Sequence, residues 1–258
     1  MKAIRIAFNT ANLVGRVSGY RFKLAEWGRQ ADATASSMSD GGWAAICAEI
    51  SRAGYHAAEV WVAHCDPRFT TEAVARRRRA IMDEQGLEPI GLGGALTAQN
   101  ARICQWMGIP VANGGFWGTT LADVRRVSKA TGIRCNYENH PEKSVEEIRG
   151  QIEGGDAALG VCLDTGWLGS NTIDAPAAVR SLGPLVRNVH LKDVRAPGGH
   201  ETCPLGMGCV GIRGVIQALH ASGYTGWLSW EDEPEDRNPM DIASDMRGFI
   251  EGELNRLR

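Results

Sequence analysis

The chain has 258 residues, 22% charged side chains and a formal net charge of −2. This balance lacks the basic excess typical of proteins that bind nucleic acid or anionic membranes, so we expect neither partner. No stretch approaches the roughly 18 apolar residues of a membrane span, and the N-terminus lacks the apolar run of a signal peptide. The seven cysteines are scattered and form no Cys-X-X-Cys pair, which favours a reducing cytoplasm.

Short apolar runs alternate about eight times with amphipathic runs along the chain. Apolar runs without strict alternation are typical of strands buried on both faces of a parallel sheet. In chain order we predict strands at 4–9, 57–62, 87–93, 109–115, 133–139, 159–164, 186–193 and 226–231. We predict helices at 43–54, 70–86, 99–108, 120–132, 144–155, 174–183, 211–223 and 241–257.

This alternation predicts parallel βαβ units. Eight units in a chain of this length favour an α/β fold of the (β/α)8 TIM-barrel type over an open sheet. No low-complexity linker interrupts the chain, so we expect one catalytic domain over residues 1–258. The longest segment without a predicted element is a loop at about 11–42, after the first strand. Its aromatic and basic residues, among them Tyr20 and Trp27, favour a lid or an interface.

Ionisable side chains end four consecutive predicted strands in the second half of the chain: Glu138, Asp164, His190 and Glu231. In a TIM barrel the active site forms where the strands end, so these side chains are expected at the same height. Three carboxylates and one imidazole suit one divalent metal, Mn²⁺, Mg²⁺, Co²⁺ or Zn²⁺. Without a cation the carboxylates would repel and raise each other's pKa. The alternative is that each acid caps a helix or pairs with a base separately.

Such a metal suggests a reaction class. A metal that holds a carbonyl and a neighbouring hydroxyl acidifies the adjacent C–H and stabilises an enediolate. The leading base is His140, because imidazole titrates near neutral pH, and Glu138 or Glu231 could also transfer a proton. Return of the proton to the opposite face gives an epimer, whereas loss of a group from the β carbon is an elimination. The alternative for His140 is a supporting or capping role.

Five further side chains are candidates for substrate contact. His64 follows the second predicted strand, which also contains Glu59, and His200 lies in the loop after the seventh. Trp117 follows a glycine pair that lets the backbone approach a ligand, so its ring could stack on a sugar. The remaining two candidates are Trp167 and Lys192. A packed turn for Trp117 and a salt bridge for Lys192 are the alternatives.

Several motifs resemble those of the xylose-isomerase-like TIM barrels, which include sugar phosphate isomerases/epimerases and inosose dehydratases. They lie at 137–140, 163–167, 189–193, 204–208 and 223–231. The resemblance covers nearly the whole chain, although its specific motifs lie after residue 132. It implies that the four strand-end residues named above are the metal ligands and that the substrate is sugar-like.

Two departures from that superfamily's ketose 3-epimerases argue against simple ketose epimerisation. Those enzymes usually carry a histidine three residues after the aspartate of the sixth strand, where this chain has Trp167. They also place an arginine shortly after the histidine of the seventh strand, where this chain has Ala196.

A narrower resemblance links residues 8–13, 19–22 and 138–143 to the catalytic subunit of bacterial C-glycoside deglycosidases. Those enzymes cleave the carbon–carbon bond of 3-oxo-C-glycosides, depend on Mn²⁺ and work with a small second subunit. The resemblance implies Mn²⁺ as the metal, His140 as the base and a small partner subunit, within a higher oligomer as one option. Our leading hypothesis is therefore a C–C lyase, with a sugar isomerase/epimerase or an inosose-type dehydratase as the alternative.

Three other hypotheses carry less support. An AP-endonuclease-like nuclease needs a trinuclear zinc cluster with more histidines, and Trp167 occupies one of those ligand positions. A non-catalytic sugar-binding subunit would be expected if the ligand set were broken, and the set is intact. A phosphorylated substrate stays open, because the glycine-rich stretch 204–208 could form an anion-binding nest.

Overall fold

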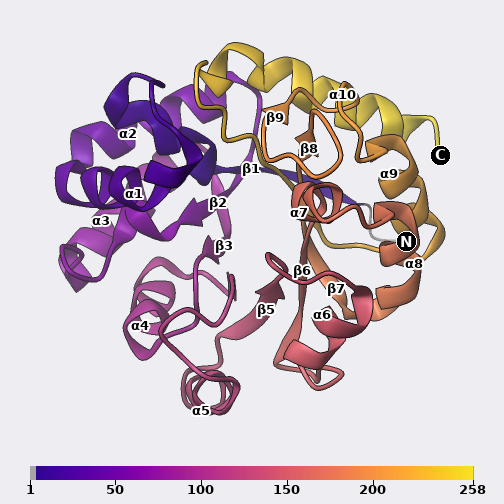
Figure 1. Ribbon diagram of the computed structural model, residues 1–258. Coiled ribbons are helices and arrows are strands. Elements are labelled where there is room, and N and C mark those ends of the chain that lie inside the picture. The colour runs from indigo at the N-terminus through magenta and orange to yellow at the C-terminus, as the bar shows by residue number, and fades with distance from the viewer. Residues whose placement is uncertain (1–3, 258) are drawn as a thin grey trace.

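The computed structural model describes residues 4–257 and contains a closed barrel of eight parallel strands, which confirms the predicted (β/α)8 fold (Figure 1). Residues 1–3 and 258 of the expected domain lie outside the described residues. Around the ring, the strands follow the order β1, β10, β7, β6, β5, β4, β3 and β2. Their bounds are β1 Arg5–Asn9, β2 Ala57–Trp61, β3 Glu88–Gly93, β4 Val111–Asn113, β5 Arg134–Glu138, β6 Leu159–Asp164, β7 Val186–Leu191 and β10 Trp227–Trp230.

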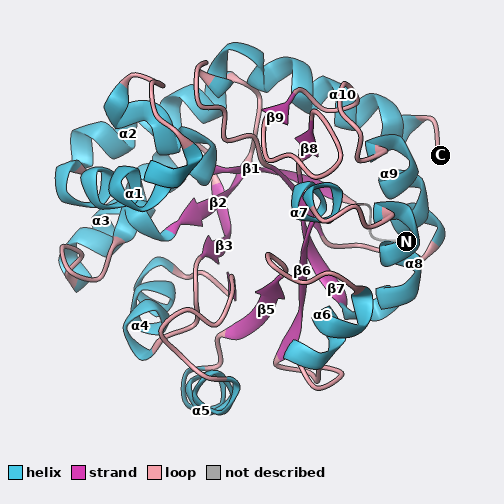
Figure 2. Ribbon diagram, in the orientation of Figure 1, coloured by secondary structure: helices cyan, strands magenta, loops and turns pink. Residues whose placement is uncertain are grey.

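Helices surround the barrel on its outside (Figure 2). Side-chain oxygens of Thr71, Thr97 and Thr120 accept backbone N–H groups of the first turns of α3, α4 and α5, which fixes where these helices begin. None of the helices within residues 4–257 is both long and apolar enough to cross a membrane. The helices that match predicted ones are α2 Asp40–Arg52, α3 Glu72–Glu84, α4 Ala98–Met107, α5 Leu121–Thr131, α6 Val145–Gln151, α8 Ala175–Leu182, α9 Ile212–Ala221 and α10 Ala243–Asn255.

The segment predicted as a loop at about 11–42 is largely helical, so that part of the prediction is wrong. It holds two 3-10 helices and helix α1, and α2 also begins within it; the bounds are Thr10–Ser18, Leu24–Glu26 and Trp27–Ser37. Helix α1 buries only Gln30, Thr34 and Ala35, so its sequence lacks the apolar periodicity that reveals a helix. At its first residue, Trp27 contacts Trp61 at the end of β2 with ring centroids 4.9 Å apart. The segment therefore covers one side of the barrel mouth.

Two short elements that the sequence did not reveal lie where the strands end. Helix α7, Thr165–Ser170, follows β6 directly and is capped by Asp164, whose carboxylate accepts the N–H of Trp167 at 3.0 Å. A small antiparallel sheet joins β8, Asp193–Val194, to β9, Thr202–Cys203. Both elements add side chains to the barrel mouth.

The apolar core lies mainly between the strands and the surrounding helices, with Trp43 and Trp230 among its largest members. The strands also carry buried polar side chains, among them Glu59, Asn113, Asn136, Asn188 and Ser229. Buried polar groups need partners. Those of Glu59 connect it to the candidate site described next.

Candidate metal centre

The four side chains predicted as metal ligands meet at the mouth of the barrel. Glu138 ends β5, Asp164 ends β6, His190 is the last residue but one of β7, and Glu231 follows β10. In the strand register Asp164 pairs with His190, and His190 pairs with Ser229, two residues before Glu231. Residues two apart along a strand point to the same face. One potential ligand atom from each side chain therefore lies within 4.8 Å of the others.

The hydrogen bonding of this cluster fits a bound cation. His190 Nδ1 lies 2.7 Å from Glu138 Oε1, whereas Glu231 Oε2, 2.9 Å from the same nitrogen, is not aligned for a hydrogen bond. Asp164 Oδ2 is also buried without a hydrogen-bond partner among residues 4–257. Buried carboxylate oxygens without donors are costly. A divalent cation relieves that cost, and this donor set suits Mn²⁺, Mg²⁺, Co²⁺ or Zn²⁺.

The charges of the cluster shift the pKa values of its members in opposite directions. Burial raises the pKa of Asp164, and the carboxylates of Glu231 and Glu138 raise it further. Burial opposes a charge on His190, but the surrounding acidic groups raise its pKa well above the usual value. Burial would likewise raise the pKa of Glu231, yet the Lys192 ammonium and His190 lower it to about 2. The raised pKa of His190 reflects the negative charge of the acids around it, whereas the lowered pKa of Glu231 reflects the positive charges of Lys192 and His190.

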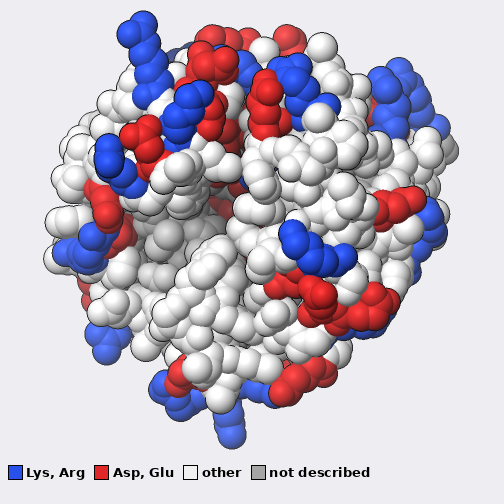
Figure 3. Space-filling model, viewed as in Figure 1, with Lys and Arg blue, Asp and Glu red and all other residues white. Residues whose placement is uncertain are grey.

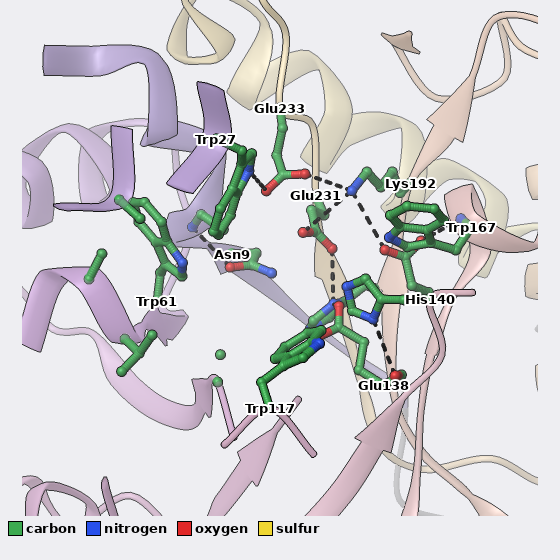
Figure 4. A pocket seen from close by; sticks show the side chains of 18 of the residues that line it. Asn9, Trp27, Trp61, Trp117, Glu138, His140, Trp167, Lys192, Glu231 and Glu233 are labelled. Carbon is green, nitrogen blue, oxygen red and sulfur yellow. Dashed lines mark hydrogen bonds and ion pairs between the residues drawn. The ribbon is translucent and has the colours of Figure 1, made fainter. Parts of the chain in front are cut away.

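Lys192 and Glu233 form a polar pair beside the cluster (Figure 4). Lys192 Nζ lies 2.7 Å from Glu233 Oε2, 3.6 Å from Asp164 Oδ2 and 3.7 Å from Glu231 Oε1. Glu233 Oε1 accepts a hydrogen bond from the indole N–H of Trp27 at 3.2 Å. Burial and the nearby Glu231 raise the pKa of Glu233 to about 7. Lys192 lines the cavity and forms a salt bridge with Glu233, which was the alternative to its predicted substrate contact. Glu233 is a further lining residue that was not predicted.

His140 lies at the cavity wall beside Glu138 (Figure 4). Its Nδ1 is 3.3 Å from the backbone carbonyl oxygen of Glu138, which fits an N–H donor there and leaves the lone pair on Nε2. Glu142 holds this loop, because it accepts the backbone N–H of His140 at 2.8 Å and the hydroxyl of Tyr137 at 2.5 Å. An imidazole with an available lone pair next to the cluster is suited to proton transfer.

Aromatic rings line two sides of the cavity, whose volume is about 620 Å³. On one side four rings lie in succession, with centroid separations of 4.7, 5.1 and 4.9 Å. This aromatic row consists of Trp117, His140, Trp167 and His200. On the other side lie Trp27 and Trp61 (Figure 4). Figure 3 shows the hollow near the centre of this face, with uncharged residues along much of its rim.

His64 does not line the cavity, so its predicted substrate contact is not supported by its position. The chain turns into a 3-10 helix directly after β2, and this turn buries the imidazole beside Trp43 and Trp61. Its Nδ1 lies 2.9 Å from the hydroxyl of Thr10. Burial, with the positive charge of Arg78, lowers the pKa of His64 to about 3. The ring is therefore a neutral part of the core.

The glycine-rich stretch 204–208 encloses a carboxylate of the chain itself. Asp193 Oδ2 accepts the N–H groups of Gly206 and Gly208 at 2.9 and 3.0 Å, and Oδ1 accepts that of Val210 at 3.2 Å. Such a nest of donors holds an anion. Because Asp193 supplies the anion, this stretch does not offer a phosphate site. Lys192 thus points into the cavity, whereas its neighbour Asp193 points into this nest.

Several other residues of the cavity were not predicted. Asn9 ends β1, Trp61 ends β2 and Trp27 begins α1, and all three line the cavity. Asn9 could have been predicted from the sequence, because it is a polar residue at the end of a predicted strand. Trp27 belongs to the segment whose aromatic and basic residues favoured a lid or an interface, but no pattern in the sequence placed its ring at the cavity.

Comparisons with known proteins agree with this architecture. The family model described as a xylose isomerase-like TIM barrel matches residues 47–251. An inosose dehydratase of Clostridium beijerinckii is 25% identical over 216 residues, which cover 71% of each chain. A 3-dehydroquinate dehydratase of Chelativorans sp. is 31% identical over 121 residues, 43% of this chain and 79% of that protein. The crystal structure of D-allulose 3-epimerase from Methylomonas sp. in complex with D-allulose shares the fold, with a TM-score of 0.71, 16% identity and 98% of each chain covered.

Proposed function

Because the chain belongs to the xylose isomerase-like TIM-barrel family, we propose that it is a divalent-metal-dependent enzyme that removes water from a cyclic polyhydroxy ketone. The carbon next to the carbonyl loses a proton, and the following carbon loses its hydroxyl group. The observation that carries this proposal is the buried cluster of carboxylates and imidazole with His140 beside it in one cavity. The similarity to an inosose dehydratase and a 3-dehydroquinate dehydratase supports an elimination.

The side chains around the cluster can carry out the proton transfers. When bound, a divalent cation supplies Lewis acidity for the carbonyl and hydroxyl oxygens of the substrate. His140 Nε2 accepts the proton from the carbon next to the carbonyl. The same imidazole then returns that proton to the departing hydroxyl, so that water leaves and the charges balance. The Lys192 ammonium orients the substrate by donating a hydrogen bond to one of its oxygens.

The opposite wall of the cavity favours elimination over epimerisation. Epimerisation needs a second group that returns a proton to the other face of the substrate, whereas this elimination needs one base. Trp27 and Trp61 line the wall that faces His140, and neither indole can return a proton to carbon. Glu233 also lines the cavity, but Lys192 and Trp27 occupy its two oxygens, and His200 is exposed at the rim. Outside the metal cluster, His140 is therefore the acid–base group with an available lone pair beside the cluster.

Cleavage of a C-glycoside is a second candidate, favoured by the size and lining of the cavity. Its volume of about 620 Å³ lies within the range of roughly 300–1,000 Å³ that accommodates drug-sized ligands, which are larger than one sugar ring. The aromatic row could stack on an aromatic leaving group. The first proton transfer is then the same, the carbon–carbon bond breaks in place of the carbon–oxygen bond, and the departing carbon takes up the proton that His140 holds. A small partner subunit, as the resemblance implies, belongs to this candidate.

An NMR assay in D2O tests the proposal. The purified protein receives Mn²⁺, with or without a chelator, and is incubated with free ketoses, an inosose and a 3-oxo-C-glycoside. We expect chelator-sensitive loss of water from the inosose, visible as loss of ring C–H signals and growth of the dehydrated product.

Other outcomes point elsewhere. Release of the aglycone from the 3-oxo-C-glycoside, without dehydration of the inosose, would favour the second candidate. Entry of solvent deuterium into a ketose without loss of any group would indicate an isomerase or epimerase. Activity that persists in the chelator would contradict the metal requirement.

A further inference from the structure

A buried glutamate lies behind the metal cluster. Glu59 is in the middle of β2, has 0% exposure and does not line the cavity. The other residues of β2 are apolar. A carboxylate within an apolar strand is costly unless it is fully hydrogen-bonded. The partners of Glu59 therefore indicate why an acid is present there.

The two oxygens of Glu59 have separate partners. Oε2 accepts hydrogen bonds from Asn188 Nδ2 at 3.0 Å and from Ser229 Oγ at 2.8 Å. Oε1 lies 2.8 Å from Nε2 of His190. Because the Asn188 and Ser229 donors both point at Oε2, Oε1 is left to contact the imidazole of His190.

The two ring nitrogens of His190 consequently face different surroundings. Nδ1 faces the carboxylates of Glu138 and Glu231, at 2.7 and 2.9 Å. Nε2 lies 2.8 Å from the carboxylate of Glu59, and the thiol of Cys162 is a further neighbour of the His190 side chain. A ring nitrogen that binds a metal presents its lone pair, which leaves the ring proton on the other nitrogen. A carboxylate opposite that proton fixes both the tautomer and the plane of the ring.

We propose that Glu59 is the positioning residue of the metal centre: it keeps the ring proton of His190 on Nε2 and thereby presents Nδ1 to the divalent cation. This inference rests on the metal-binding part of the proposed function and does not depend on the substrate. Because Glu59 does not line the cavity, it acts through His190.

The variant Glu59→Gln tests this role through the orientation of one amide. Asn188 and Ser229 still direct donors at the position that Oε2 occupies in Glu59, which we call the inner position. The amide oxygen of the glutamine therefore takes the inner position, and its N–H group faces His190. Nε2 must then accept, which moves the ring proton to Nδ1, where the cation binds. We expect the Kd for Mn²⁺, measured by EPR titration, to rise about ten- to hundredfold.

A second substitution is designed to reverse the amide. Asn188→Asp in the Glu59→Gln background places an acceptor at the inner position, so the amide N–H turns inward and its oxygen faces His190. We expect the double variant to recover about tenfold in Mn²⁺ affinity relative to Glu59→Gln. A merely structural loss would not be relieved by a further buried substitution.

Two other variants complete the series. Ser229→Ala is the matched control, because it removes one donor to Glu59 and leaves the contact with His190; we expect a change of Kd within about threefold. Glu59→Asp keeps the charge but shortens the side chain away from His190, so it should weaken Mn²⁺ binding even where the amide variant does not fold. Thermal unfolding without metal establishes that each variant is folded.

The outcomes separate this inference from the proposed function. A wild-type protein that binds no Mn²⁺ would contradict the metal-binding part of the proposed function. Wild-type binding together with an unchanged Kd in folded Glu59→Gln overturns the role of Glu59 alone. A loss of affinity that Asn188→Asp does not relieve, in a folded double variant, overturns the hydrogen-bond explanation.

Discussion

The two sides of the barrel mouth bring different chemistry to one cavity. The side formed by β5, β6, β7 and β10 ends in carboxylates and an imidazole, whereas the side that follows β1 and β2 contributes the indoles of Trp27 and Trp61. On the charged side two buried carboxylate oxygens, Asp164 Oδ2 and Glu231 Oε2, lack hydrogen-bond donors among residues 4–257, and a cation could bind there. The aromatic side is stable by packing. Ionisable residues at strand ends can therefore be recognised in a sequence, whereas aromatic residues that line a cavity cannot be told from aromatic residues of the core.

Two buried histidines show the same contrast. His190 lies among carboxylates that raise its pKa well above the usual value, whereas burial lowers the pKa of His64 to about 3. Both residues lie at or after the end of a barrel strand. Only His190 belongs to the cluster that could hold a metal, because the chain after β2 turns His64 into the core. The direction of a side chain relative to the barrel mouth, more than its residue type, therefore determines its role.

The largest effect is expected when the charged side loses one charge. Glu231→Gln removes a carboxylate from the metal cluster, so metal and activity should be lost together, with affinity falling by more than about a hundredfold. Metal content after dialysis and turnover in the D2O assay measure both. Glu251→Gln, a partly exposed glutamate of α10, is the matched control and should change neither. Unchanged metal content in Glu231→Gln would contradict the assignment of metal binding to this side of the mouth.

His140→Ala separates chemistry from metal binding on the same side. The variant keeps all four residues of the cluster but lacks the base, so kcat should fall about 10²- to 10⁴-fold while metal content stays unchanged. His220→Ala, at an exposed position of α9, is the control. Full turnover in His140→Ala would exclude this histidine from the mechanism.

The aromatic row offers a sharper test of binding. Trp167 is half-buried between His140 and His200, whereas Trp117 is 55% exposed at the rim. We expect Trp167→Ala to raise KM about tenfold, which is near the upper end of one aromatic contact. Trp117→Ala should have a smaller effect because its ring buries less surface. Steady-state kinetics decide this, and an unchanged KM in both variants would show that the row does not bind the substrate.

The smallest effect concerns stability and His64. Its pKa falls from 6.5 to about 3 on folding, so the unfolded chain takes up the proton first. The stabilisation is complete above about pH 6.5 and is lost as the pH falls toward 3, at about 1.4 kcal/mol per pH unit. Between pH 7.5 and 5 the wild type should therefore lose about 2 kcal/mol more than His64→Gln. Urea unfolding at both pH values measures this, and equal losses would contradict the neutral, buried ring.

The amino-acid sequence by itself determined the barrel and the reactive strand ends. Apolar runs and amphipathic runs are local patterns, so the eight strands and most helices could be predicted from them. The (β/α)8 topology then places every strand end on one face, so the sequence alone predicts that Glu138, Asp164, His190 and Glu231 lie together. Helix α1 escaped prediction because its buried face consists of small and polar residues.

Only the tertiary structure decided which other residues belong to the site. Glu59 reaches His190 across 131 positions of the chain, and Trp27 reaches Glu233 across 206. Such contacts exist only after the barrel closes and brings its first strands beside its last ones. Contacts between distant segments also hold His64 in the core beside Thr10 and place Asp193 in the glycine-rich nest. Local patterns identify side chains able to react, but the direction in which each one points depends on the packing of distant segments.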